Sequence, residues 1–355
     1  MAKVAIFLPD WSKGNPYLVM LKDAVGRCGI DVRLRDFPPG FFPINRIISR
    51  EDRPYVVHIH WINDLIEAIH WSSTSLKTHT KLALLMLDIA FARLRGVKIF
   101  WTIHNLVAHE SPNPTVEVRA RRALALTCTH LFAHSHSALR LIEKTYGLDL
   151  AHKASVIPLG NYDGCYPNLR GSEERLRARF GLTKENMVIL FFGAIRPYKG
   201  VEKLIQAFRT VENEQMRLLI MGNAESIELG NAITLAAQSD PRIIAAIGFV
   251  PDDDVGALFA IADVVAIPFE RTLTSGSAML AFTMSKALLL PERARAFDFV
   301  NDDNAIFYGS DAHLHARLVT LDRERLAAMG LKGRLAVEGF DWNSIGARVV
   351  ARYDS

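Results

Sequence analysis

The sequence predicts an α/β protein with two open, parallel sheets in tandem, and three observations lead to this prediction. The chain has 355 residues, 50% of them hydrophobic and 23% charged, which exceeds the usual size of a single compact core. Short apolar runs alternate with helical patterns along most of the chain, as in right-handed βαβ units. Residues 161–174, rich in turn formers and without periodicity, interrupt this alternation and indicate a linker.

Each half of the chain supplies its own series of elements. The first half predicts strands at residues 4–10, 31–37, 55–61, 97–105, 130–135 and 153–160, with helices at 17–29, 76–96, 119–128 and 139–147. The second half predicts strands at 187–196, 216–223, 242–250, 263–269 and 287–291, with helices at 200–211, 232–238, 254–262 and 274–285.

The composition favours a cytoplasmic protein. Cys28, Cys128 and Cys165 are widely spaced and odd in number, which fits neither a disulfide framework nor a metal site. The residues after Met1 do not read as a secretory signal. No uncharged apolar run reaches the roughly 20 residues of a membrane-spanning helix, because Asp88 interrupts the best candidate.

The positive charge is concentrated in the first half of the chain. Residues 1–170 carry 21 lysines and arginines against 14 acidic residues, whereas the remainder carries 21 against 24. A basic first half favours an anionic partner, such as an acidic sugar, a lipid diphosphate or a membrane surface. Scattered solvated charges explain the same count. No basic run is interleaved with aromatic residues, so nucleic-acid binding is not expected.

Four strand-to-helix loops are candidate sites, because open parallel sheets bind ligands beyond the carboxyl ends of their strands. The first loop, residues 11–16, contains Gly14 and Asn15. Its glycine allows backbone N–H groups to approach a phosphate or a sugar. The loop matches neither the dinucleotide-binding nor the P-loop pattern, and a plain turn is the alternative interpretation.

Two loops in the second half are suited to a diphosphate. In Gly193–Gly200, Arg196 offers a bidentate fork to phosphate oxygens and Lys199 adds a point charge. Ser275 and Gly276 begin a helix, whose amino end supplies N–H donors and a positive dipole end. The alternatives are a surface turn with a capping lysine and an ordinary serine N-cap.

The fourth loop carries titratable groups after a buried strand of the basic half. His104, His109 and Glu110 cluster there, and one of them is a candidate general base or hydrogen-bond donor. His60 and Trp61 follow the neighbouring strand, where the indole is suited to stacking on a sugar. Structural histidines and core packing of the tryptophan are the alternatives.

The residues of these loops resemble the GT-B glycosyltransferases. The matching motifs are Gly193-x-x-Arg196-Pro-Tyr-Lys199-Gly200-Val-Glu, Thr102-x-His104-Asn105-Leu and Ser275-Gly276. More narrowly, Asn15-Pro16-Tyr17-Leu18, His58-x-His60-Trp61 and His109-Glu110 are similar to bacterial exopolysaccharide enzymes of the xanthan-type β-mannosyltransferase group. The resemblance extends from Gly14 to about Pro291.

The resemblance implies two Rossmann-like domains that face each other across a cleft. Residues 1–165 would bind the acceptor and residues 175–335 the nucleotide sugar, and a helix in 336–355 would return to the first domain. The implied reaction moves a hexose or hexuronic acid from GDP-mannose or a UDP-sugar to a lipid-linked (polyprenyl diphosphate) oligosaccharide in exopolysaccharide synthesis.

The resemblance also implies roles for individual residues, without a cofactor or a metal ion. Catalysis is expected from His104 and Glu110. Donor binding is expected from Gly14, Asn15, Arg196, Tyr198, Lys199, Val250, Glu270, Ser275 and Gly276. Acceptor binding is expected from His60, Trp61, Asn105 and His109.

One departure from the family pattern concerns stereochemistry. Retaining enzymes of this fold carry two glutamates around the donor-binding helix, where this sequence has Thr272 and Leu280, and Glu270 is the nearby acid. Inversion instead needs a base near the acceptor hydroxyl, for which Glu110 and His104 are candidates. Asp252-Asp253-Asp254 is interpreted as the acidic first turn of a helix rather than a metal site.

The helix at residues 76–95 is compatible with a peripheral position on the cytoplasmic face of the inner membrane. Its apolar middle is flanked by Lys77, Lys81, Arg93 and Arg95, as in interfacial helices. A buried helix of the first sheet is the alternative. At the level of function, the alternatives are a catalytically weak binding or scaffold protein and another sugar-nucleotide enzyme, such as an epimerase.

Overall fold

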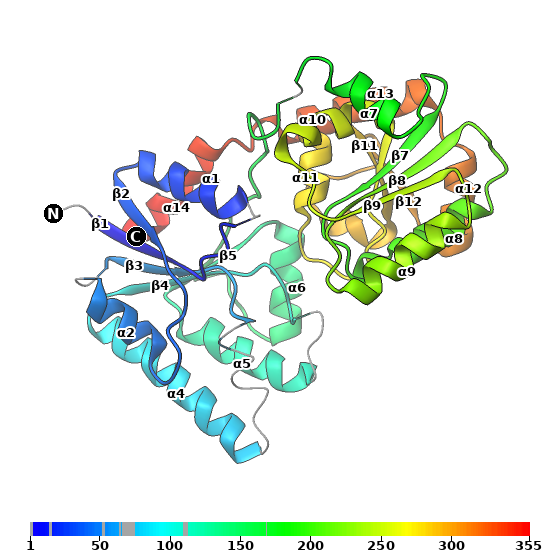
Figure 1. The fold of residues 1–355 in the computed structure, drawn as a ribbon. Helices are drawn as coiled ribbons and strands as arrows, with labels where there is room; N and C mark the ends of the chain where they lie inside the picture. Colours follow the sequence, from blue (N-terminus) through cyan, green and yellow to red (C-terminus); the bar gives the residue numbers. More distant parts are fainter. Residues whose placement is uncertain are drawn as a thin grey trace. The chain divides into compact units, whose positions relative to one another are not determined.

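The computed structural model describes residues 3–13, 16–51, 54–63, 65, 75–108, 113–167 and 169–355. They form two units, each built around a parallel six-stranded sheet (Figure 1). Unit 1 comprises Met1–Gly160 and Phe340–Ser355, and unit 2 comprises Asn161–Gly339. The predicted fold class of two Rossmann-like α/β domains is confirmed.

The sheet of unit 1 has the order β2-β1-β3-β4-β5-β6. Its order reverses between β1 and β3, and doubly wound sheets hold ligands beyond the carboxyl ends at such a reversal. Buried apolar side chains on both faces explain why these short runs form parallel strands. The strands are β1 (Lys3–Leu8), β2 (Ile30–Leu34), β3 (Val56–Ile59), β4 (Lys98–Thr102), β5 (His130–Ala133) and β6 (Ala154–Val156).

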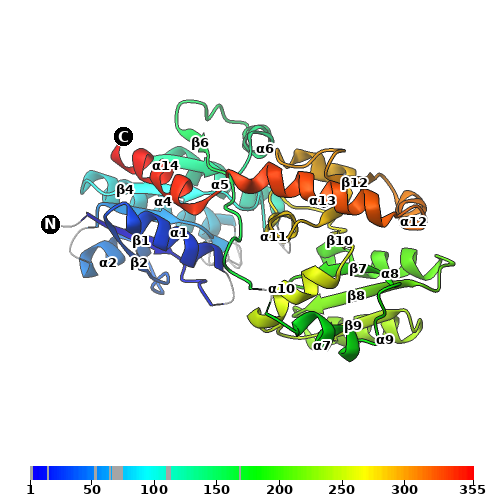
Figure 2. The ribbon, with the colours of Figure 1, turned by 90° about the horizontal axis from the view of Figure 1, so that it is seen from above.

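Helices cover both faces of this sheet, with α1 and α14 on one side and α2, α4 and α5 on the other (Figure 1). The carboxyl-terminal helix α14 lies alongside α1, as both views show (Figure 2). A Cβ on Gly346 would lie 2.6 Å from the backbone of Ala24, so glycine permits this close packing. The helices are α1 (Pro16–Arg27), α2 (Pro43–Arg50), α4 (Ser75–Leu94), α5 (Pro114–Thr127), α6 (His136–Tyr146) and α14 (Trp342–Asp354).

The sheet of unit 2 has the order β12-β11-β10-β7-β8-β9 and reverses between β10 and β7. Its strands are β7 (Met187–Phe192), β8 (Met216–Gly222), β9 (Ile243–Ile247), β10 (Val264–Ala266), β11 (Ala287–Pro291) and β12 (Ala305–Tyr308). Its helices are α7 (Ser172–Arg179), η1 (Pro197–Lys199), α8 (Val201–Arg209), α9 (Ile227–Gln238), α10 (Asp252–Ile261), α11 (Gly276–Thr283), η2 (Glu292–Ala296), α12 (Asp311–Val319) and α13 (Arg323–Glu338).

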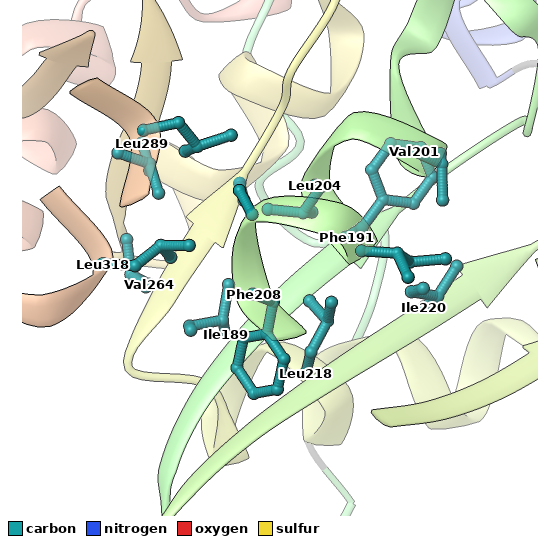
Figure 3. Close-up of a cluster of buried hydrophobic side chains, with 14 of the residues drawn as sticks. Ile189, Phe191, Val201, Leu204, Phe208, Leu218, Ile220, Val264, Leu289 and Leu318 are labelled. Carbon is teal, nitrogen blue, oxygen red and sulfur yellow. The ribbon is translucent and has the colours of Figure 1, made fainter. Parts of the chain in front are cut away.

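A close-packed apolar core packs α8, α9, α12 and α13 of unit 2 against the sheet (Figure 3). Helix α8 contributes residues at helical spacing, Val201, Leu204 and Phe208, all at most 3% exposed. They pack against alternate residues of the central strands, including Ile189 of β7 and Leu218 of β8. This packing holds the loop between β7 and α8 in a defined position.

The segment predicted as a linker, residues 161–174, belongs to unit 2 instead. The Asn161 side chain donates to the Val337 carbonyl at 3.2 Å, and the Tyr162 N–H donates to Thr283 Oγ1 at 3.1 Å. Helix α7 begins within this segment at Ser172. The turn-forming residues at the start of the segment therefore find their partners far along the chain.

None of the helices in the described ranges is long and apolar enough to cross a membrane.

Candidate functional site

In unit 2, the loops after β7 and β10 lie side by side at the reversal of strand order. Strands β7 and β10 are paired, with Val264 opposite Ile189. The Glu270 N–H donates to the Tyr198 carbonyl at 2.8 Å, which joins the two loops. Gly200 has a φ of +68°, and a Cβ there would lie 2.3 Å from the Pro268 carbonyl oxygen. Glycine is therefore required where the loops meet.

The loop after β7 also lies against the first turn of α11. Gly193 has a φ of +126°, and a Cβ there would lie 3.0 Å from Ser277 Oγ. Two features predicted separately from the sequence, the Gly193–Gly200 loop and the Ser275-Gly276 helix start, are thus brought together. The backbone groups of the loop and of the helix start therefore lie together at the switch point of the sheet.

Two cations stand in the loop after β7. Arg196 is exposed and pairs with Glu225, at 2.8 Å between Nη1 and Oε1. Lys199 Nζ lies 5.5 Å from the centre of the Tyr198 ring. Burial and the neighbouring Arg196 lower the pKa of Lys199 to about 8. A bound anion would favour the charged form of this lysine, so the loop is electrostatically suited to phosphate.

The start of α11 offers backbone rather than side-chain donors. Ser275 is 3% exposed, and its Oγ accepts from the Ala278 N–H at 3.2 Å. Its hydroxyl therefore serves as the N-cap, the alternative interpretation from the sequence. The N–H groups of Gly276 and Ser277 lie in the first turn, where a helix provides no acceptor for them, and they stand at the positive end of the helix dipole.

The other donor-site candidates of unit 2 lie at the same edge of the sheet. Glu270 Oε1 pairs with Lys203 Nζ at 2.5 Å, and this ion pair lowers the pKa of the carboxyl group. Val250 follows β9, separated from β7 by β8, and the adjacent Phe249 is 79% exposed. Leu280 is buried in α11, so this position supplies a core contact and no ligand.

In unit 1, three neighbouring strands each deliver a histidine at their carboxyl ends. His60 follows β3, His104 follows β4 and His134 follows β5. The ring centres of His60 and His104 are 5.9 Å apart, and those of His104 and His134 are 5.0 Å apart. The Tyr17 ring, from α1, contacts all three rings in T-shaped geometry. We call His58, His60, His104 and His134 the histidine cluster.

The histidine cluster is buried and neutral. Each of its members is at most 9% exposed. Burial lowers the pKa of His58, His60 and His104 well below the ordinary value, and the neighbouring histidines lower these pKa values further. Burial also lowers the pKa of His134 to about 4. Neutral imidazole carries one donor and one acceptor nitrogen, so a ring whose acceptor nitrogen has no partner in the described structure, such as His104, is able to accept a proton from a ligand.

A stack of aromatic rings reaches from this cluster to the surface. Trp61 stacks on His104, with ring centres 4.6 Å apart and planes inclined by 14°. Trp11, which is 37% exposed, stacks on Trp61 at 5.0 Å. Trp61 is half-buried, so it lies between the buried His104 and an exposed indole, and it is not an ordinary core residue.

The structure adds residues that the sequence analysis did not select. Trp11 contacts Trp61, and His134 contacts His104. Tyr17 contacts His60, Trp61 and His104. The position of His134 directly after a strand could have identified it as a site residue from the sequence. Asn105 is half-buried, and its backbone carbonyl accepts from Arg121 at 3.0 Å. Gly14, Asn15, His109 and Glu110 lie outside the described residues.

Within the described part of the chain, no three His, Cys, Asp or Glu side chains form a group that could hold a metal ion.

Comparisons by sequence match this chain to glycosyltransferases. Residues 172–277 match the family model of glycosyl transferases group 1. The GDP-mannose:glycolipid 4-beta-D-mannosyltransferase of Xanthomonas campestris pv. campestris is 26% identical over 336 residues, which cover 94% of this chain and 86% of that protein. The lipopolysaccharide 1,2-N-acetylglucosaminetransferase of Salmonella typhimurium is 22% identical over 56% of this chain and 55% of its own length.

Solved structures share the fold at low sequence identity. Anabaena HepE, in complex with UDP and glucose, matches with a TM-score of 0.77 and 15% identity, over 100% of both chains. WaaG, a glycosyltransferase involved in lipopolysaccharide biosynthesis, matches with a TM-score of 0.64 and 15% identity, over 99% of both chains.

Proposed function

This chain is a glycosyltransferase of the GT-B fold, and from that premise we propose that it transfers a hexose or hexuronic acid from a nucleoside diphosphate sugar to a lipid-linked oligosaccharide in exopolysaccharide synthesis. GDP-mannose is the first donor to test and a UDP-sugar the second. The observation that carries the proposal is the joining of the Arg196–Lys199 loop and the α11 start at one switch point. The Xanthomonas relative, named for GDP-mannose and a glycolipid, supports the choice of donor and acceptor.

In this proposal unit 2 binds the donor diphosphate. Arg196 exchanges its exposed contact with Glu225 for phosphate oxygens, and Lys199 and the N–H groups at the start of α11 complete the site. These groups balance the charge that develops on the leaving nucleoside diphosphate. The proposal therefore assigns this task to the protein and not to a metal ion.

Unit 1 binds the acceptor and supplies the base. His104 accepts the proton of the acceptor hydroxyl as the oxygen attacks the anomeric carbon, and the C–O bond to the diphosphate breaks with its electron pair. One displacement of this kind inverts the anomeric configuration. The exposed Trp11–Trp61 stack offers an apolar face to the acceptor sugar.

An apolar pocket in unit 1 is suited to the lipid part of the acceptor. The pocket has a volume of about 350 Å³. Phe41 lines the pocket and is 67% exposed. On the neighbouring helix α4, Phe91 is 47% exposed and Leu94 is 82% exposed. Exposed apolar groups of this size near basic residues are typical of surfaces that meet a membrane. The pocket is lined by Phe37, Pro38, Pro39, Gly40, Phe41, Phe42, Pro43, Leu65, Lys81, Leu84 and Leu85.

Transfer itself tests the proposal. The full chain is incubated with GDP-mannose, or in parallel with UDP-sugars, and with a polyprenyl-diphosphate-linked oligosaccharide, and the product is identified by mass spectrometry. A thermal-shift series with GDP and UDP selects the base, since a ligand of the native state raises the apparent stability. Nucleotide binding without transfer would favour a binding protein, and a changed donor sugar without transfer would favour an epimerase.

Removal of either cation is expected to weaken binding of the nucleoside diphosphate. Arg196→Ala and Lys199→Ala each remove a charged hydrogen bond, about 1.5–3 kcal/mol, or roughly ten- to a hundredfold in Kd by calorimetry. Arg209→Ala is the matched control, because Arg209 is exposed at the far end of α8. Wild-type affinity in both site variants would place the diphosphate elsewhere.

Loss of the exposed apolar side chains is expected to weaken membrane binding. Phe41→Ser combined with Leu94→Ser removes two large side chains worth about 1.5–3 kcal/mol each when buried, so pelleting with phosphatidylglycerol-containing vesicles should fall at least about tenfold. Ile227→Ser, at a 78% exposed position of unit 2, is the control. Equal pelleting of both variants would reject this face as the membrane contact.

A further inference from the structure

His134 connects His104 to a backbone carbonyl. His134 Nδ1 lies 3.0 Å from the Ile157 carbonyl oxygen, and His134 Nε2 lies 3.2 Å from His104 Nδ1. Both imidazoles are 9% exposed. The three groups come from the ends of β4, β5 and β6, so the strand order of the sheet fixes their spacing.

This chain of contacts permits one arrangement of protons. A carbonyl oxygen only accepts hydrogen bonds, so the His134 nitrogen that faces Ile157 carries a proton. Neutral His134 then has a lone pair on Nε2, and His104 Nδ1 must donate to it. Because neutral His104 carries a single ring proton, its Nε2 is left as an acceptor. Burial supports the neutral form of both rings, since it lowers the pKa of each.

The remaining nitrogen of His104, Nε2, is a buried acceptor. Among the described residues, none forms a hydrogen bond with His104 Nε2. The Trp61 ring lies flat on the imidazole, and the Tyr17 ring meets it at 89°, so aromatic packing holds its orientation. A buried acceptor without a partner costs free energy, which a ligand hydroxyl would recover.

We propose that His134 is a positioning residue, which fixes His104 as the Nδ1–H tautomer and so keeps Nε2 ready to take the proton of the acceptor hydroxyl. This inference rests on the proposed function. When the hydroxyl proton moves to Nε2, the acceptor oxygen forms the bond to the anomeric carbon and the nucleoside diphosphate leaves with the electron pair. The resulting imidazolium keeps its Nδ1–H bond to His134.

The tautomer is measured without any turnover. In ¹⁵N-histidine-labelled full-length protein at pH 7.5, long-range ¹H–¹⁵N correlation spectra distinguish protonated from bare ring nitrogens. His104→Asn identifies the signals of His104 by their disappearance. The expected result is a protonated Nδ1 and a bare Nε2. A protonated Nε2 on His104 would overturn the inference, whatever the activity of the enzyme.

Two replacements of His134 test the consequence for the reaction. Glutamine offers an amide group to Ile157 and an oxygen to His104 Nδ1, so His134→Gln should keep kcat within a few-fold. His134→Leu removes the acceptor of Nδ1–H and should lower kcat at least about tenfold, with an unchanged KM for GDP-mannose. Equal loss in both variants, or no loss in His134→Leu, would contradict a positioning role.

Other outcomes separate this inference from the proposed function. If His104→Asn retains full kcat, the assignment of His104 as base is wrong, whereas the NMR tautomer still stands or falls by itself. If His134→Leu does not fold, as judged by tryptophan fluorescence, the wild-type spectra and the His134→Gln rates decide the question.

Discussion

Lowering the pH from 7.5 to 5.5 is expected to remove about 5 kcal/mol from the free energy of unfolding of unit 1. The cause is the histidine cluster, four imidazoles that are neutral in the folded unit. Outside the cluster, His130 lowers the pKa of His58 and the Ile157 carbonyl raises that of His134; no carboxylate faces the four rings in the described structure. At one pH unit below its pKa in the unfolded chain, each histidine that must stay neutral lowers the free energy of unfolding by about 1.4 kcal/mol.

The sign of this effect follows from the proton count. Below the unfolded pKa of 6.5, the unfolded chain binds protons that the folded cluster does not. Stability is therefore complete above pH 6.5 and decreases as the pH falls towards the folded values, which for His134 means about 4. Unit 1 should thus unfold in mild acid, at a pH where most carboxylates are still ionised.

Tryptophan fluorescence measures this unit selectively. All five tryptophans of the chain fall within the ranges of unit 1, whereas unit 2 contains two of the twelve histidines. Urea titrations at several pH values then give the slope of the free energy of unfolding against pH. His60→Leu should reduce the slope by about 1.4 kcal/mol per pH unit, and His152→Gln, at an exposed position, should leave it unchanged. A free energy independent of pH would mean that the native cluster binds protons freely.

The sequence predicts those parts of the fold and site that depend on local pattern. Alternating apolar runs identified the strands around Arg196, and the rule that ligands bind at carboxyl ends of strands selected the loops after β4 and β7. The pattern could not show which strand ends are neighbours. His134 contacts His104 because β5 pairs with β4, and Trp11 stacks on Trp61 because β1 pairs with β3.

Hydrogen bonds of the folded chain show how two further predicted segments are used. Asn161 and Tyr162 read as linker residues, yet their partners Val337 and Thr283 lie more than 100 positions away. Ser275 was selected as a phosphate contact, and its hydroxyl is used by its own helix. For Asn161 and Tyr162 the competing partner was visible only in the folded chain, whereas for Ser275 the sequence already offered the N-cap as the alternative.

Replacement of Arg121 by methionine is expected to destabilise unit 1 by about 3–5 kcal/mol, because it leaves the charge of Glu117 buried and uncompensated. The two side chains are 3% and 0% exposed, with Arg121 Nη2 2.6 Å from Glu117 Oε1. Glu117 also accepts the Ala108 N–H at 2.6 Å, and Arg121 donates to the Asn105 carbonyl. The pair therefore holds the loop that follows His104.

A double replacement separates the cost of a lone buried charge from the value of the pair. Glu117→Met combined with Arg121→Met removes both charges, so it should be more stable than either single variant in urea titrations followed by tryptophan fluorescence. The exposed pair Lys3–Asp354 gives the comparison, and Lys3→Met should cost at most about 1 kcal/mol. If the double variant is as unstable as Arg121→Met, the contacts of the pair to Asn105 and Ala108, and not the unpaired charge, account for the loss. That result would mean that the buried ion pair holds the loop beside His104, the proposed base, in place, and that loss of the pair also lowers kcat.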